Sequence, residues 1–175
     1  MISEFLKHTG ELLRKYPQVR LTFSQEQAIR NTVLSVLGLN NINQLRDRYE
    51  GQAFWDKTLK NYGGLVACQK HLGIEVTSIE NINIRDFKPQ IKGKDSIYDI
   101  EVFDFGQLPD LELKSIKNPT IFVIQKDKST FSICGFGNKQ LILENLVDSS
   151  NETVKSVELK KFIGFKVLSP IDDIL

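Results

Sequence analysis

The sequence predicts an α+β protein, with a helical N-terminal half followed by a small mixed β-sheet with flanking helices. Two observations support this prediction. Apolar side chains recur at helical spacing through the first 73 residues, and after about residue 83 short apolar runs alternate with turn residues, which is typical of strands. A chain of 175 residues with 41% hydrophobic and 26% charged residues can bury one compact core. We therefore expect a helical region (1–83) packed as one unit with a mixed-sheet region (84–175).

Helical periodicity, capping residues and breakers define the elements of the helical region. Ser24 and Gln27 have the spacing of a capping box, which places a helix start at Ser24. Gly63 and Gly64 are expected to interrupt a later helix, because glycine is a poor helix former. The expected helices are 2–16, 24–37, 41–49, 54–62 and 65–72.

The segment 72–82 allows two interpretations. A helix-turn-helix motif needs an apolar residue, a glycine and further apolar positions, and the chain offers Leu72, Gly73, Ile74, Ile79 and Ile82. The position four residues before the glycine usually carries a small side chain, but here it is Gln69. Because the β-branched residues of this segment also suit a strand, we favour a helix-to-strand transition.

The mixed-sheet region shows alternating and continuous apolar runs between turn signals. Residues 120–125 and 130–136 are expected to form a hairpin, and a helix is expected over 139–147. The other expected strands are 97–105, 111–116 and 162–168, and loops are expected at 88–89 and 92–94.

Charge and cysteine content narrow the class of protein. The net charge is +1, but residues 1–94 hold 14 Lys and Arg against 9 Asp and Glu, whereas residues 95–175 hold 9 against 13. Cys68 and Cys134 lie in apolar surroundings, and with His8 and His71 they lack zinc-site spacing. The apolar surroundings of the cysteines lead us to expect buried thiols in a cytoplasmic protein. We also expect the protein to be soluble, because no apolar run has the roughly 20 residues of a membrane span.

The stretch 97–114 carries the candidate chemistry. Asp99 lies on a β-rich run, and Glu112 and Lys114 lie two residues apart on the next expected strand, so their side chains would project together while Leu111 and Leu113 point inward. Two carboxylates, Asp99 and Glu112, can hold Mg²⁺, and the Lys114 ammonium can stabilise developing negative charge or orient a water. An ordinary half-exposed strand would show the same alternation.

With helices first, then an acid on a strand and then Glu112-Leu-Lys114-Ser-Ile, the chain resembles the restriction-endonuclease-like superfamily of PD-(D/E)xK nucleases, over roughly residues 91–170. The resemblance implies a mixed sheet flanked by helices, Mg²⁺ as cofactor, DNA as substrate and a possible homodimer. It assigns Glu112 and Lys114 to the Glu-x-Lys half of the motif, and Asp99 or Asp95 to the preceding acid.

Two functional hypotheses remain open from the sequence. The first is a Mg²⁺-dependent DNA endonuclease with catalytic residues Asp99, Glu112 and Lys114. Its phosphate-binding surface would come from basic residues near or within the helical half, namely Lys57, Lys60, Lys70, Arg85 and Lys88. The second is a non-catalytic module that binds DNA or a protein partner.

Overall fold

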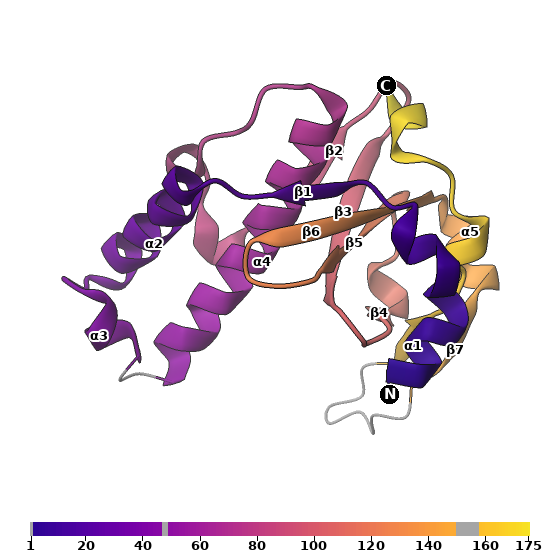
Figure 1. Ribbon diagram of the computed structural model, residues 1–175, viewed down its shortest axis with the longest axis horizontal. Helices are drawn as coiled ribbons and strands as arrows, with labels where there is room; N and C mark the ends of the chain where they lie inside the picture. The colour runs from indigo at the N-terminus through magenta and orange to yellow at the C-terminus, as the bar shows by residue number, and fades with distance from the viewer. Residues whose placement is uncertain (1, 47–48, 150–157) are drawn as a thin grey trace.

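The computed structural model describes residues 2–46, 49–149 and 158–175 and shows a mixed α+β fold (Figure 1). Its main sheet has five strands in the order β1-β6-β5-β3-β2. The strand bounds are Gln18–Arg20 for β1, Gln90–Lys92 for β2, Ile97–Asp104 for β3, Thr120–Gln125 for β5 and Thr130–Gly137 for β6. The sheet is mixed, as predicted, because β3 and β5 pair in parallel while the other pairs are antiparallel.

A second, smaller sheet is antiparallel and has the order β4-β8-β7. It combines β4 (Asp110–Glu112) from the crossover between β3 and β5 with β7 (Leu146–Asp148) and β8 (Leu159–Phe162). The predicted strand 111–116 is therefore only half correct, because Leu113–Ser115 forms a 3₁₀ turn, η4. The prediction of a strand over 162–168 is also displaced, since β8 ends at Phe162 and Phe165–Val167 is a 3₁₀ turn, η5.

Figure 1 shows the helices on two sides of the main sheet, with α2, α3 and α4 gathered on one side and α1 and α5 on the other. The α-helices are α1 (Ile2–Thr9), α2 (Phe23–Leu37), α3 (Ile42–Arg46), α4 (Tyr49–Leu72) and α5 (Lys139–Glu144). Further 3₁₀ turns are η1 (Gly10–Arg14), η2 (Ile79–Asn81), η3 (Ile84–Asp86) and η6 (Ile171–Ile174). None of the helices within the described ranges has the length and apolar character of a membrane span.

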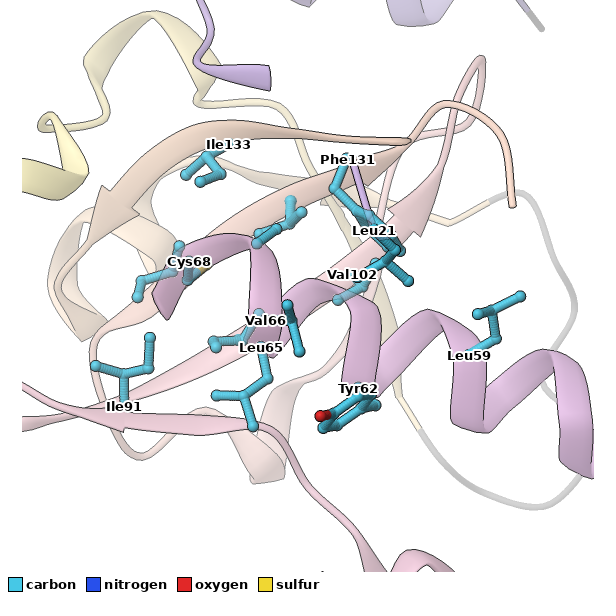
Figure 2. Close-up of a cluster of buried hydrophobic side chains, with 14 of the residues drawn as sticks. Leu21, Leu59, Tyr62, Leu65, Val66, Cys68, Ile91, Val102, Phe131 and Ile133 are labelled. Carbon is cyan, nitrogen blue, oxygen red and sulfur yellow. The ribbon is translucent and has the colours of Figure 1, made fainter. Parts of the chain in front are cut away.

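The first hydrophobic core lies between α4 and one face of the main sheet (Figure 2). Val66 and Cys68 of α4, Val102 of β3 and Phe131 and Ile133 of β6 are buried in it. Cys68 is a free thiol whose pKa is raised by burial. The core also takes in Ile29 and Val33 of α2, so the helical and mixed-sheet regions share one apolar interior.

The second core covers the opposite face of the main sheet. Phe122 of β5 stacks on Phe162 of β8, with ring centroids 4.2 Å apart and an interplanar angle of 6°. Phe5 of α1 packs edge-on against Phe103, and Cys134 is a buried free thiol in the same cluster. The first helix is thus separated from α2 and α4 by the sheet, because a sheet with two apolar faces needs cover on both.

Helix α4 runs without interruption from Tyr49 to Leu72, so the predicted break at Gly63-Gly64 is wrong. The two glycines instead let the helix approach the sheet closely. A Cβ atom on Gly63 would lie less than 3.0 Å from the Phe131 ring, and one on Gly64 less than 3.0 Å from Val102. Close packing here outweighs the loss of helix propensity, which is about 1 kcal/mol per glycine relative to alanine.

Other predictions for the helical region need correction. The capping residue of α2 is Thr22, two residues before the predicted Ser24, because Thr22 and Gln25 form the capping box in place of Ser24 and Gln27. The first 73 residues are not all helical, since β1 pairs with β6. After α4 the chain forms neither a second helix nor a strand, but an irregular segment leading to η2. Both interpretations of the segment 72–82, the helix-turn-helix motif and the favoured helix-to-strand transition, are therefore wrong.

The glycine pair makes a testable prediction. Replacing Gly63 with Ala should destabilise the fold by about 1–3 kcal/mol, because the added methyl group collides with the Phe131 ring. Combining Gly63→Ala with Phe131→Leu should cost less than the sum of the two single changes, since the smaller side chain vacates the space. Urea unfolding of the four proteins measures this coupling. Additive effects would show that the helix does not depend on the contact.

The aromatic core makes a second prediction. Phe122 lies in a continuous apolar run, which predicts a core position, and it is fully buried. Phe122→Ala should therefore lower the free energy of unfolding by roughly 3–5 kcal/mol. The helical spacing of Trp55 and Leu59 predicts that Trp55 also faces inward, but it is only partly buried against the first core. Trp55→Ala should therefore cost clearly less in the same urea titration. Equal losses would contradict this difference in burial.

Candidate functional site

A polar depression lies beside the edge of β3, and we call it the carboxylate pocket. Its volume is about 450 Å³. Two acids of β3, Asp99 and Glu101, share it with four lysines, an amide from α4 and several residues of the loops before β2 and after η4. The polar lining residues are Lys57, Asn61, Lys88, Gln90, Asp99, Glu101, Lys114, Ser115, Lys117 and Asn118.

Strand pairing explains why the pocket opens here. β2 is three residues long and pairs only with Ile97 to Asp99 of the eight-residue strand β3. One more bond follows, from the Ile100 amide to the Pro89 carbonyl (3.0 Å). Because β2 extends no further, the edge of β3 beyond this point is bordered by side chains instead of a strand. Lys57 and Asn61 of α4 supply part of that border.

Asp99 is positioned by two amide side chains. Its Oδ1 accepts hydrogen bonds from Gln90 Nε2 (2.6 Å) and Asn118 Nδ2 (3.3 Å). Gln90 is its antiparallel partner on β2, and Asn118 comes just before β5. Neutral donors on both sides fix the carboxylate without neutralising its charge, which leaves Asp99 suited to binding a cation.

Glu101 is the acid of the pocket whose pKa is raised by its surroundings. It follows Asp99 by two residues on the strand, so both side chains project from the same face of β3. Burial raises the pKa of the Glu101 carboxyl to about 7, against the partial opposition of the Lys60 ammonium, and the negative charges of Asp99 and Asp110 raise it further. A second carboxyl therefore lies beside Asp99, in a position where burial disfavours its ionised form.

The structure brings together two of the three site residues predicted from the sequence. Asp99 and Lys114 both line the carboxylate pocket, whereas Glu112 is not among its lining residues. The expected arrangement of Glu112 beside Lys114 on one strand face is wrong, because β4 ends at Glu112 and Lys114 lies in the turn η4. Glu112 is exposed, and its carboxylate accepts a hydrogen bond from the hydroxyl of Ser115 (3.1 Å), itself a lining residue.

Asp95 was the alternative to Asp99 as the first acid. It is exposed in the bend between β2 and β3 and does not line the carboxylate pocket. Of the two acids, Asp99 is the one that shares a site with Lys114.

The basic residues expected to face phosphates are divided by the fold. Lys57 and Lys88 line the carboxylate pocket. Lys70 is engaged by the Arg20 carbonyl and the Gln25 side chain (3.0 Å), and Arg85 donates to the Val36 carbonyl (3.0 Å). These last two residues therefore hold the fold together in the described conformation.

The donor set of the carboxylate pocket meets the requirements of Mg²⁺. This ion commonly takes one or two protein carboxylates and keeps several waters. Asp99 and Glu101 supply such a pair. Burial is the main cause of the raised pKa of Glu101 and the charge of Asp99 adds to it, so a divalent cation bound beside both carboxylates would favour the ionised form of Glu101. Within residues 2–46, 49–149 and 158–175, no group of three or more His, Cys, Asp or Glu side chains could hold a metal. The fit therefore rests on a carboxylate pair.

Comparison with family models, curated proteins and solved structures gave no match for this chain. The site is thus argued from its own residues. Glu101 was missed from the sequence because Val102 and Phe103 follow it in an apolar strand, yet the spacing Asp99-x-Glu101 on one predicted strand already placed two carboxylates on one face.

The raised pKa of Glu101 predicts a pH-dependent stability. The carboxyl of Glu101 has a pKa of about 7 in the folded state, above its ordinary value. Its contribution to stability is therefore fully present when the pH is below that ordinary pKa. This stabilisation is lost as the pH rises through 7. In EDTA, the titration of Glu101 should lower the free energy of unfolding by up to about 1.4 kcal/mol per pH unit between pH 5 and 7.

Glu101→Gln should remove that slope and stabilise the protein at pH 8, which urea titrations at several pH values can measure. The exposed Glu75 offers a matched control, since Glu75→Gln should leave the slope unchanged. Both histidines remain in every variant, so their titration cancels in the comparison. A wild-type slope retained in Glu101→Gln would contradict the assignment.

Proposed function

We propose that this protein is a Mg²⁺-dependent nuclease that hydrolyses phosphodiester bonds in DNA, with the carboxylate pocket as its active site. The observation that supports this most strongly is the gathering of Asp99, Glu101 and Lys114 in one depression with three further lysines. Metal-assisted phosphodiester hydrolysis uses this combination, in which a metal site lies beside cations that bind the charged backbone.

In this proposal Asp99 and Glu101 would hold the metal, which when bound supplies charge stabilisation and a more acidic water. Gln90 and Asn118 orient Asp99 through the hydrogen bonds described above. Lys114 lies on the pocket wall, where its ammonium can stabilise negative charge developing on a phosphate. Lys57, Lys88 and Lys117 contribute positive charge for the flanking phosphates.

Glu112 has a different place in the proposal from the one the sequence suggested. Its hydrogen bond to Ser115 connects it to the pocket wall and to the turn that carries Lys114. We therefore propose that Glu112 positions the Lys114 turn, with Glu101 in the metal role first assigned to Glu112.

The test is a cleavage assay combined with a metal-binding assay. Purified protein is incubated with supercoiled plasmid and with a single-stranded DNA circle, in Mg²⁺ and in EDTA, and Mg²⁺ binding is followed by calorimetry. Asp99→Asn and Glu101→Gln should abolish both metal binding and cleavage. Lys114→Ala should abolish cleavage but leave metal binding partly intact, because the ammonium is not a metal ligand.

Glu112→Gln distinguishes the two carboxylate assignments. It should retain metal binding if Glu101 is the second ligand, and lose it if Glu112 is. Since Glu101→Gln is expected to be more stable than wild type at pH 8, its inactivity could not be attributed to unfolding. A wild-type protein that neither binds Mg²⁺ nor cuts either DNA would overturn the nuclease proposal in favour of a non-catalytic binding module.

A further inference from the structure

A second pocket, separate from the carboxylate pocket, lies where α2, α3 and α4 meet the β5-β6 hairpin. We call it the aromatic pocket. Phe23 and Trp55 line it together with the aliphatic side chains of Ile42, Leu45 and Leu59. Its volume is about 270 Å³, and the exposed surface of its lining is mainly apolar. A space of this volume with a mainly apolar lining suits one flat ring better than an extended ligand.

Polar groups lie among the apolar lining. Arg30 and Lys128 supply positive charge, and Glu26 and Gln27 supply acceptors and an amide. The Glu26 carboxylate is engaged by the hydroxyl of Ser129. Phe23 is 72% exposed although it is a large apolar residue. A ring stacked on an aromatic side chain, with hydrogen-bonding edges and a nearby anion, is the chemistry of a nucleotide.

A third depression, which we call the lysine pocket, adjoins both other pockets. It shares Leu59 and Lys128 with the aromatic pocket and Lys57 with the carboxylate pocket. Its other cations are Lys60 and Lys126. The lysine pocket, which includes the last residues of the parallel strands β3 and β5, therefore adjoins each of the other two depressions through shared lining residues.

The lysine pocket also contains three acids, and each has a partner within the fold. Asp56 accepts a hydrogen bond from the Gln52 side chain (3.0 Å). Asp104 forms an ion pair with Lys60 (3.1 Å). Asp127 accepts hydrogen bonds from two backbone amides of the hairpin, which lower the pKa of its carboxyl. By contrast, no ion pair joins Lys57, Lys126 or Lys128 to an acid within the described residues. These three ammonium groups are available to an external anion.

From these observations we infer that the three pockets form one binding track for single-stranded nucleic acid. An unpaired base enters the aromatic pocket, and the following phosphates lie over the lysine pocket toward the carboxylate pocket. The occupant is single-stranded because a base can enter a pocket only when it is released from its partner and its stack. The direction of the track rests on the proposed function, whereas the base site rests on the aromatic pocket alone.

The single tryptophan of the chain gives a direct test. Trp55 fluorescence is followed in EDTA, so that cleavage plays no part, while a twelve-residue oligothymidylate is added to the full-length protein. Saturable quenching is expected, with affinity at least about tenfold higher than for a duplex of the same length. Parallel titrations with oligodeoxyuridylate and oligouridylate, which differ only in the 2′-hydroxyl, report whether the sugar matters, and inorganic polyphosphate reports binding by charge alone.

Phe23→Ala should weaken oligothymidylate binding by about tenfold or more. Its exposure means that the change should not unfold the protein. Val167→Ala is the matched control, because Val167 is 53% exposed and lines none of the three pockets. Lys128→Ala should weaken binding and reduce the salt dependence by about 0.7 in the slope of log affinity against log salt. Lys139→Ala, at an exposed position on α5, should do neither.

The outcomes separate this inference from the nuclease proposal. Quenching by oligothymidylate with no cleavage in Mg²⁺ would support the track and overturn the nuclease. Cleavage with no response of Trp55, or with no effect of Phe23→Ala, would support the nuclease and overturn the track. Equal affinity for duplex and single strand, or equal quenching by polyphosphate, would also overturn the base site.

Discussion

The close packing of α4 against the main sheet is the contact on which the rest of the structure depends. Two adjacent glycines, Gly63 and Gly64, remove the side chains that would hold the helix away from Phe131 and Val102. α4 can then run as one rod of 24 residues along the sheet. The length of this rod carries Lys57, Lys60 and Asn61 to the edge of β3 and Trp55 to the junction with α2 and α3.

The site itself arises from a mismatch in strand length. β2 covers only the start of β3, and the continuing edge of β3 is left to side chains. Carboxylates at Asp99 and Glu101 then lie partly enclosed without being sealed in the core. Partial enclosure raises the pKa of Glu101 and makes a cation a favourable neighbour. The short strand β2 is therefore the feature that leaves both acids in an open pocket.

Local sequence signals were reliable wherever neighbouring residues settle the conformation. The hairpin of β5 and β6, the strand β3 and the burial of Phe122 follow from alternating or continuous apolar runs between turn residues. Errors arose where a distant partner decided the outcome. β1 and β2 have three residues each, and such short runs become strands only because β6 and β3 offer them an edge. The same holds for Glu112 and Lys114, whose predicted strand ends at Glu112 where its pairing with β8 ends.

By itself the sequence determined the mixed α+β class, most helix and strand locations, the burial of both cysteines and the importance of Asp99 and Lys114 as candidates for one site. These depend on periodicity and on residue chemistry, which act over a few neighbouring positions. Only the tertiary structure decided that Glu101 joins these residues, that Glu112 does not line their pocket and that Trp55 lies beside a cavity. Each of these facts depends on which distant segment packs against the residue. A local sequence pattern cannot predict this, because it depends only on residues a few positions apart.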